Sequence, residues 1–155
     1  MQPPVSAEFQ LDDEAHSARF GAALGLCLRP GDTVLLQGPL GAGKSHIARA
    51  AIRALVGADI DVPSPTFTLV QVYDGPLCEI WHADLYRLTG PDEVVELGLQ
   101  DAMERAIALV EWPERLGANV PLGAIWLRLD YQGDARQATL TGARDEILAA
   151  LRATA

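Results

Sequence analysis

The sequence has almost no lysine: Lys44 is the only one, and every other basic side chain is an arginine. A coding preference for arginine explains that background but not the exception. A lysine kept against such a background is typical of a site where a compact ammonium and a guanidinium are not interchangeable.

Cysteine and histidine are also scarce. Cys27 and Cys78 stand far apart in apolar runs, without the spacing of a C-x-x-C motif. The three histidines, at 16, 46 and 82, form no metal-ligand pattern and are expected on the surface or in the core. A disulfide scaffold and a Cys/His metal site are therefore disfavoured, and we expect reduced thiols.

Long apolar runs and excess positive charge are missing as well. No run approaches the length of a membrane span, and residues 1–7 lack the charged and apolar regions of a signal peptide. We therefore expect a cytoplasmic protein with no membrane partner. The formal net charge of -9 disfavours a broad basic surface for gripping RNA.

The length predicts one domain. A chain of 155 residues with 49% hydrophobic content can bury one core but not two substantial ones. We expect a single domain over residues 1–155, with an N-terminal tail of about residues 1–8 and a C-terminal helix of about residues 144–153.

One glycine-rich stretch carries the strongest signal. Residues 38–45, Gly-Pro-Leu-Gly-Ala-Gly-Lys-Ser, have the G-x-x-x-x-G-K-[ST] spacing of a phosphate-binding loop. The glycines let backbone N–H groups turn inward around phosphate oxygens, a concavity that a Cβ at Gly41 or Gly43 would obstruct. The contacts expected with the nucleotide phosphates come from Leu40, Gly41, Ala42, Gly43, Lys44, Ser45 and His46.

The flanking sequence supports this interpretation. Residues 33–37 are an apolar run of buried-strand length, and residues 45–56 place apolar side chains at helical spacing. In this setting Lys44 would reach the β- and γ-phosphates, and Ser45 would offer its hydroxyl to Mg²⁺. The competing interpretation is a glycine-rich turn that binds nothing.

The remaining patterns alternate between helices and strands, which indicates the α/β class. We expect a short strand over 9–11, a helix to about 28, a hairpin of strands 67–73 and 77–83, and short helices near 90–97 and 99–105. A central strand over 106–110 precedes a second hairpin, with strands 123–131 and 135–141.

Two carboxylates follow strand-like runs. Glu111 ends the apolar run of residues 106–110, and Asp84 ends the run of residues 78–83. Ligands of open α/β sheets collect at the carboxyl ends of the strands, so either side chain could carry Mg²⁺ or orient water. The alternatives are an exposed strand-end carboxylate for Glu111 and a turn or helix cap for Asp84.

Three further positions have two interpretations each. In the stiff loop of residues 63–69, Thr66 or Ser64 could sense the γ-phosphate, or the loop could be a rigid turn. Trp112 could stack on a partner or base, or lie in the core. Arg87 could neutralise charge on phosphate, or form a surface ion pair.

Four motifs together resemble the TsaE (YjeE) family. They are residues 38–45, Ser-Pro-Thr-Phe-Thr-Leu-Val at 64–70, His-Ala-Asp-Leu-Tyr-Arg-Leu at 82–88 and Glu-Trp-Pro-Glu at 111–114. The resemblance covers roughly residues 9–141. It implies a P-loop NTPase fold with a mixed sheet, flanking helices and antiparallel edge hairpins.

The resemblance also implies a function. Such a chain would be an accessory ATPase in making N6-threonylcarbamoyladenosine at position 37 of tRNA, binding and resetting TsaD and TsaB, with tRNA held only indirectly. It implies ATP and Mg²⁺ as cofactors. It assigns Ser45 and Glu111 to Mg²⁺, Asp84 to catalysis and Thr66 to a switch loop. Trp112 would lie beside the nucleotide, and Leu11 near the adenine.

The match is not complete. Ser45 and His46 stand where the family often has two threonines, and Phe67 replaces a common tyrosine. Two rival functions stay open: a small-molecule kinase that uses the same loop, and a nucleotide-gated binding module with negligible turnover. Against the kinase, the sequence has no arginine-rich lid and few polar groups after Asp84 and Glu111.

Overall fold

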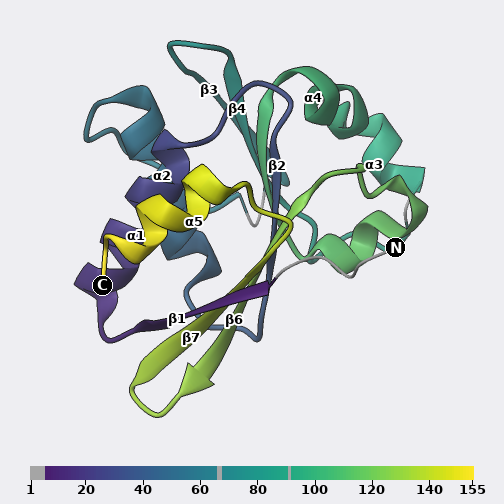
Figure 1. The fold of residues 1–155 in the computed structure, drawn as a ribbon. Helices are drawn as coiled ribbons and strands as arrows, with labels where there is room; N and C mark the ends of the chain where they lie inside the picture. Colours follow the sequence, from purple (N-terminus) through teal and green to yellow (C-terminus); the bar gives the residue numbers. More distant parts are fainter. Residues whose placement is uncertain (1–5, 66–67, 91) are drawn as a thin grey trace.

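The computed structural model describes residues 6–65, 68–90 and 92–155. Helices cover both faces of a seven-stranded sheet (Figure 1). The strands are β1 (Ser6–Leu11), β2 (Thr33–Gln37), β3 (Val70–Asp74), β4 (Glu79–Asp84), β5 (Ile107–Glu111), β6 (Ile125–Gln132) and β7 (Ala135–Thr141). The helices are α1 (Glu14–Leu26), α2 (Lys44–Val56), α3 (Asp92–Glu96), α4 (Leu99–Arg105) and α5 (Asp145–Arg152), with a 3₁₀ segment η1 (Pro113–Asn119).

The sheet is mixed, as expected. Its strand order is β1-β7-β6-β2-β5-β4-β3. Strands β6, β2, β5 and β4 pair in parallel, whereas β1 with β7, β7 with β6 and β3 with β4 are antiparallel. Both predicted hairpins are therefore confirmed, and β2 lies at the centre, paired on both sides with parallel strands.

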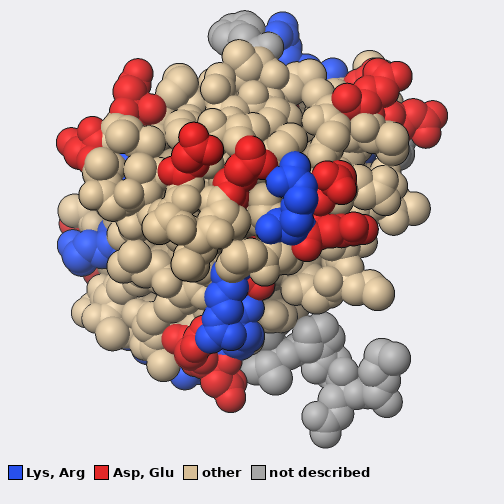
Figure 2. Space-filling model, turned by 90° about the horizontal axis from the view of Figure 1, so that it is seen from above, with Lys and Arg blue, Asp and Glu red and all other residues tan. Residues whose placement is uncertain are grey.

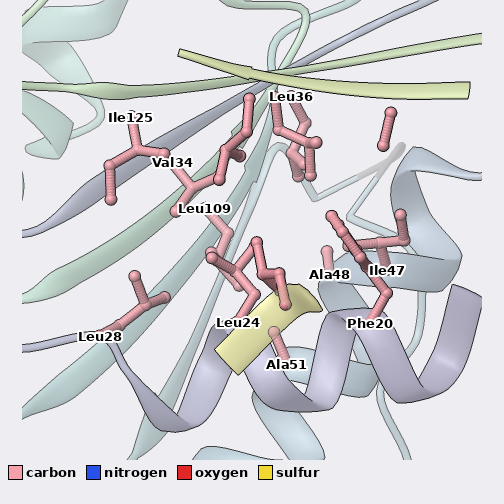
Figure 3. Packing of buried hydrophobic residues seen from close by; sticks show 14 of the residues in the cluster. Phe20, Leu24, Leu28, Val34, Leu36, Ile47, Ala48, Ala51, Leu109 and Ile125 are labelled. Carbon is pink, nitrogen blue, oxygen red and sulfur yellow. The ribbon is translucent and has the colours of Figure 1, made fainter. Parts of the chain in front are cut away.

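Alternation along the central strands divides the core into two layers. Val34 and Leu36 of β2 face α1, α2 and α5, whereas Leu35 faces α3, α4 and η1. Figure 3 shows the first layer, where side chains of α1 and α2 lie against those of β2, β5 and β6. Burial on both faces explains why β2 and β5 read as continuous apolar runs.

Helices α1 and α2 pack at close range. A Cβ added to Gly25 of α1 would lie 2.6 Å from the carbonyl oxygen of Ala51, and one on Gly21 would lie 2.7 Å from that of Ile47. Glycine allows this approach because it has no side chain to separate the helices. The contact fixes α2, and with it the glycine-rich loop that precedes α2.

The first strand is longer than the sequence indicates. Strand β1 includes residues 6–8, which the sequence assigned to the N-terminal tail. The strand is longer because β7 pairs with all of it, from Leu11↔Arg136 to Ser6↔Thr141. Strand β1 is therefore an edge strand of the sheet, next to the hairpin of β6 and β7. The last helix matches its expected range closely.

Strand β3 begins later than expected. The predicted strand of residues 67–73 is observed as Val70–Asp74, and Phe67 lies outside the described residues. Leu69 has a φ of 68°, in the left-handed region that ends a strand, and its N–H donates to the Pro65 carbonyl at 2.7 Å. The chain therefore turns just before β3.

Candidate functional site

Three parallel strands end together beside the glycine-rich loop. Strand β2 leads into the loop and α2, β5 ends at Glu111, and β4 ends at Asp84. In the register of the sheet, Glu111 lies beside Leu36 on one side and beside Asp84 on the other. The two carboxylates singled out in the sequence are thus neighbours at the carboxyl edge, where α/β folds bind ligands.

The loop has the conformation that glycine permits. Gly41 and Gly43 have φ angles of 80° and 105°, and α2 starts directly after Gly43. A Cβ on Gly41 would lie 2.8 Å from the hydroxyl of Tyr131, whereas one on Gly43 would meet nothing within 4 Å. The backbone angle therefore favours glycine at both positions; at 41 a Cβ would also crowd the Tyr131 hydroxyl, whereas at 43 no atom would obstruct it.

Lys44 is held in the loop. Its side chain is buried, and Nζ donates to the carbonyl oxygen of Gly38. The same ammonium lies 3.8 Å from the centroid of a Trp112 ring, an attractive cation–π distance. Burial lowers the pKa of Lys44, and the nearby carboxylates, Glu111 first, oppose that shift. The site thus concentrates one positive charge in a poorly hydrated place.

Glu111 is buried and doubly held. The residue is 2% exposed. The Ser45 hydroxyl lies 2.8 Å from Oε1 and 3.0 Å from Oε2, and His82 Nε2 lies 2.7 Å from Oε2. Ser45 opens α2 and His82 lies on β4, so two elements fix the carboxylate. Ser45 and Glu111, the two residues expected to hold Mg²⁺, are thus in direct contact.

Asp84 and Trp112 border the same space. Asp84 is buried, and its Oδ1 accepts a hydrogen bond of 3.0 Å from the Tyr86 N–H. The Tyr86 ring lies 4.9 Å from the Trp112 ring, between centroids. Trp112 itself has a left-handed backbone, with a φ of 59°, which turns the chain sharply after β5. Asp84 therefore caps a turn, as one interpretation held, but it does so inside the site.

Two cavities share the glycine-rich loop as part of their walls. One, of about 260 Å³, is lined by Leu40, Gly41, Gly43, Lys44, Ser45, His46, Asp84, Glu111 and Trp112. The other, of about 200 Å³, is lined by Leu11, Asp13, Glu14, Ser17, Gly41, Ala42, Gly43, His46, Asp134 and Arg136. The first combines a cation and carboxylates with the loop and the start of α2, whereas the second has both apolar and polar walls. A larger, open hollow of about 600 Å³ runs along β1 and the end of α5, away from the loop.

The structure brings nearly all expected residues to these two cavities. Leu11, expected near the adenine, lines the second cavity with Ala42. His46 lines both, and its Nε2 donates to the Glu14 carbonyl at 3.0 Å. Thr66 lies outside the described residues.

Sequence reasoning missed three contributors to the site. Tyr131 and Arg136 come from the hairpin of β6 and β7, and the Tyr131 hydroxyl donates to the Leu40 carbonyl. The length of the predicted hairpin could have indicated Tyr131 and Arg136. Strand β6 continues to Gln132, beyond its last pairing with β2 at Gln37↔Arg128, and therefore extends past the loop. His82 lies in a noted motif but was not singled out.

Charged side chains of both signs are interspersed on the surface seen in Figure 2. On the face in Figure 2, Lys and Arg side chains lie next to Asp and Glu and form no broad basic area. No described helix is both long and apolar enough to cross a membrane. Among these residues, no group of three or more His, Cys, Asp or Glu side chains could hold a metal ion alone.

Comparison with known proteins identifies the family. Residues 11–139 match the family model described as threonylcarbamoyl adenosine biosynthesis protein TsaE. The tRNA threonylcarbamoyladenosine biosynthesis protein TsaE of Rickettsia bellii is 37% identical over 130 residues, covering 84% of this chain and 90% of the relative. That of Haemophilus influenzae is 36% identical over 136 residues, covering 84% and 85%.

A solved structure agrees on the fold. YdiB of Bacillus subtilis matches with a TM-score of 0.76 over 99% of this chain and 97% of its own, at 21% identity. The fold, the family model and these relatives agree along most of the chain. It therefore belongs to the TsaE family of tRNA threonylcarbamoyladenosine biosynthesis proteins.

Proposed function

We propose that this chain is an Mg²⁺-dependent ATPase, and that it serves threonylcarbamoylation of tRNA position 37 as an accessory subunit that binds and resets a TsaD–TsaB complex. The observation that carries the proposal is the convergence of Lys44, Ser45 and Glu111 on one cavity behind a glycine-rich loop. A phosphate cradle, an ammonium and a paired hydroxyl and carboxylate are what a Mg–nucleotide site requires.

The residues fit both ligands. The amides of residues 43–46, at the start of α2, would present donors and the positive helix end to phosphate oxygens. Lys44 would exchange its contact with the Gly38 carbonyl for phosphate oxygens. Ser45 and Glu111 would hold Mg²⁺, which supplies charge neutralisation on the phosphates when bound.

Asp84 is the proposed catalytic carboxylate. It adjoins Glu111 in the sheet, and the Tyr86 N–H fixes the direction of its carboxyl group. From this position Asp84 would orient the attacking water and accept its proton. Slow turnover without partners is expected, because no arginine of the described residues lines the phosphate cavity.

The second cavity is the proposed place of the adenosine. It shares Gly41, Gly43 and His46 with the phosphate cavity. Leu11 is fully buried and gives it an apolar wall, and Arg136 and Asp134 supply polar groups at its other side. A base seated there would stay joined to phosphates bound in the phosphate cavity, because the two cavities share these loop residues.

The assay that tests the proposal is ATP hydrolysis by the purified chain, alone and with TsaD and TsaB. A pull-down with ATP, ADP or no nucleotide accompanies it, and Lys44→Ala serves as the control without productive nucleotide binding. Nucleotide-dependent association with stimulated hydrolysis is expected. Phosphate transfer to a small metabolite without association would make the chain a kinase, and association without turnover would make it a nucleotide-gated binding module.

A further inference from the structure

One buried group at the site has no part in the proposed function. His82 is 1% exposed, and its Nε2 lies 2.7 Å from Oε2 of Glu111. The imidazole therefore touches the residue proposed at the metal, although it lines neither cavity. A histidine taken out of water to this extent needs a reason, because each unpaired polar atom costs free energy.

The fold around His82 is apolar on most sides. On β4, Ile80, His82 and Asp84 point to the same face of the sheet, the one covered by α2. Beside them on β5, Ile107 and Leu109 precede Glu111 on that face. His82 thus lies between the apolar core and the polar carboxyl ends of the strands. It pairs with Leu109 in the sheet, and its side chain contacts Glu111, two residues further along β5.

The two ring nitrogens of His82 differ in their contacts. Nε2 meets a carboxylate oxygen, whereas Nδ1 is buried without a hydrogen-bond partner among the described residues. A proton on Nε2 serves the carboxylate and leaves only a lone pair unpaired at Nδ1. A proton on Nδ1 instead would bury an unsatisfied N–H and place two acceptors against each other.

We propose that His82 is a positioning residue for Glu111. Its Nε2–H donates to Oε2, and the Ser45 hydroxyl lies 2.8 Å from Oε1 and 3.0 Å from Oε2. With only Ser45, the carboxylate could rotate about its last bond; with donors from β4 and α2, its plane is fixed. The role rests on the proposed function, since a fixed carboxylate matters most to a metal that demands strict geometry.

The first test measures how much Mg²⁺ strengthens nucleotide binding. Calorimetric titration with ADP in Mg²⁺ and in EDTA gives this enhancement for wild type, His82→Leu and His82→Gln. We expect His82→Leu to lose about 10- to 100-fold of the enhancement, with metal-free affinity unchanged. His82→Gln should restore most of it, because its amide nitrogen can donate from a similar place. His16→Leu removes another buried imidazole, on α1, and should leave the enhancement intact.

The second test needs no nucleotide or metal. ¹⁵N spectra of the three histidines give the tautomer of His82 in the whole chain. A proton on Nε2, with a signal that shifts in Glu111→Gln, is expected. A ring with no proton on Nε2, or a signal indifferent to Glu111→Gln, would overturn the proposal even if His82→Leu failed to fold.

The outcomes separate the two proposals. Wild-type protein with no Mg²⁺ enhancement would overturn the Mg–nucleotide site, and the role of His82 with it. Wild-type enhancement retained in folded His82→Leu would overturn the role of His82 alone. Equal losses in His82→Leu and His82→Gln would also count against it, because a donor at that place would then be without effect.

Discussion

Lys44 combines burial with charge. Its ammonium lies under the Trp112 ring and against the Gly38 carbonyl, within the attraction of Glu111 and Asp84. Because burial lowers its pKa despite these carboxylates, desolvation outweighs their attraction. The charged side chain is therefore kept at a cost to the fold, as is common where a group serves a ligand and not the core.

This cost predicts the behaviour of Lys44→Met, which keeps most of the stem and removes the charge. A lysine whose pKa is lowered by folding destabilises the fold at pH values below that pKa, and the penalty disappears as the pH rises through it. Without nucleotide at neutral pH, Lys44→Met should melt no lower than wild type, and any gain should shrink at alkaline pH. Thermal denaturation across pH measures this, and a lower melting temperature at neutral pH would contradict it.

At the scale of elements, the contact between α1 and α2 holds the loop in place. Gly25→Ala would put a methyl group 2.6 Å from a backbone oxygen of α2. Alanine favours a helix by up to about 1 kcal/mol, but backbone cannot yield as a side chain can. We expect net destabilisation of about 1–3 kcal/mol in urea unfolding.

Gly90→Ala is the matched control, since a Cβ at Gly90 meets nothing within 4 Å. Its midpoint should stay near that of wild type. Equal urea unfolding midpoints for Gly25→Ala and wild type would contradict the prediction, because α1 and α2 would then accommodate the methyl group without a measurable loss of stability.

The hairpin of β6 and β7 supports the loop from the other side. Tyr131→Phe removes the hydroxyl that donates to the Leu40 carbonyl. A lost hydrogen bond of about 0.5–1.5 kcal/mol should weaken nucleotide binding by about 2- to 10-fold. Tyr73→Phe removes a hydroxyl on β3 that has no partner among the described residues, and should not alter the affinity. Calorimetry decides, and equal affinities for both variants would remove Tyr131 from the support of the loop.

The elements also show what sequence can predict. Strands β2 and β5 matched their expected ranges to within one residue, because both faces are buried and the apolar run is unbroken. Periodicity gives the face of a residue but not the neighbouring strand, so the pairing of β1 with β7 was not predicted. Asp84 and Glu111 could be named because each ends an apolar run at the carboxyl edge of the sheet, whereas Tyr131 reaches the loop only because β6 extends past it.

At the scale of the whole molecule, charge predicts how the chain meets tRNA. A net charge of -9 and interspersed arginines give little attraction to phosphate backbones. In gel-shift titrations at about 150 mM salt, the isolated chain should not retain tRNA at micromolar concentrations. Salt-sensitive binding by the isolated chain would contradict this and assign tRNA contact to the chain itself.

The strand order determines when the sheet can form during synthesis of the chain. Strand β2, which carries the loop, pairs with residues 108–111 and 125–128, and β1 pairs with residues 136–141. At about 5–20 residues per second, synthesis leaves the first strand without its neighbour for on the order of ten seconds. A nascent chain therefore cannot assemble the loop's supports until its last hairpin has emerged, and nucleotide should protect the finished protein but not its growing precursor.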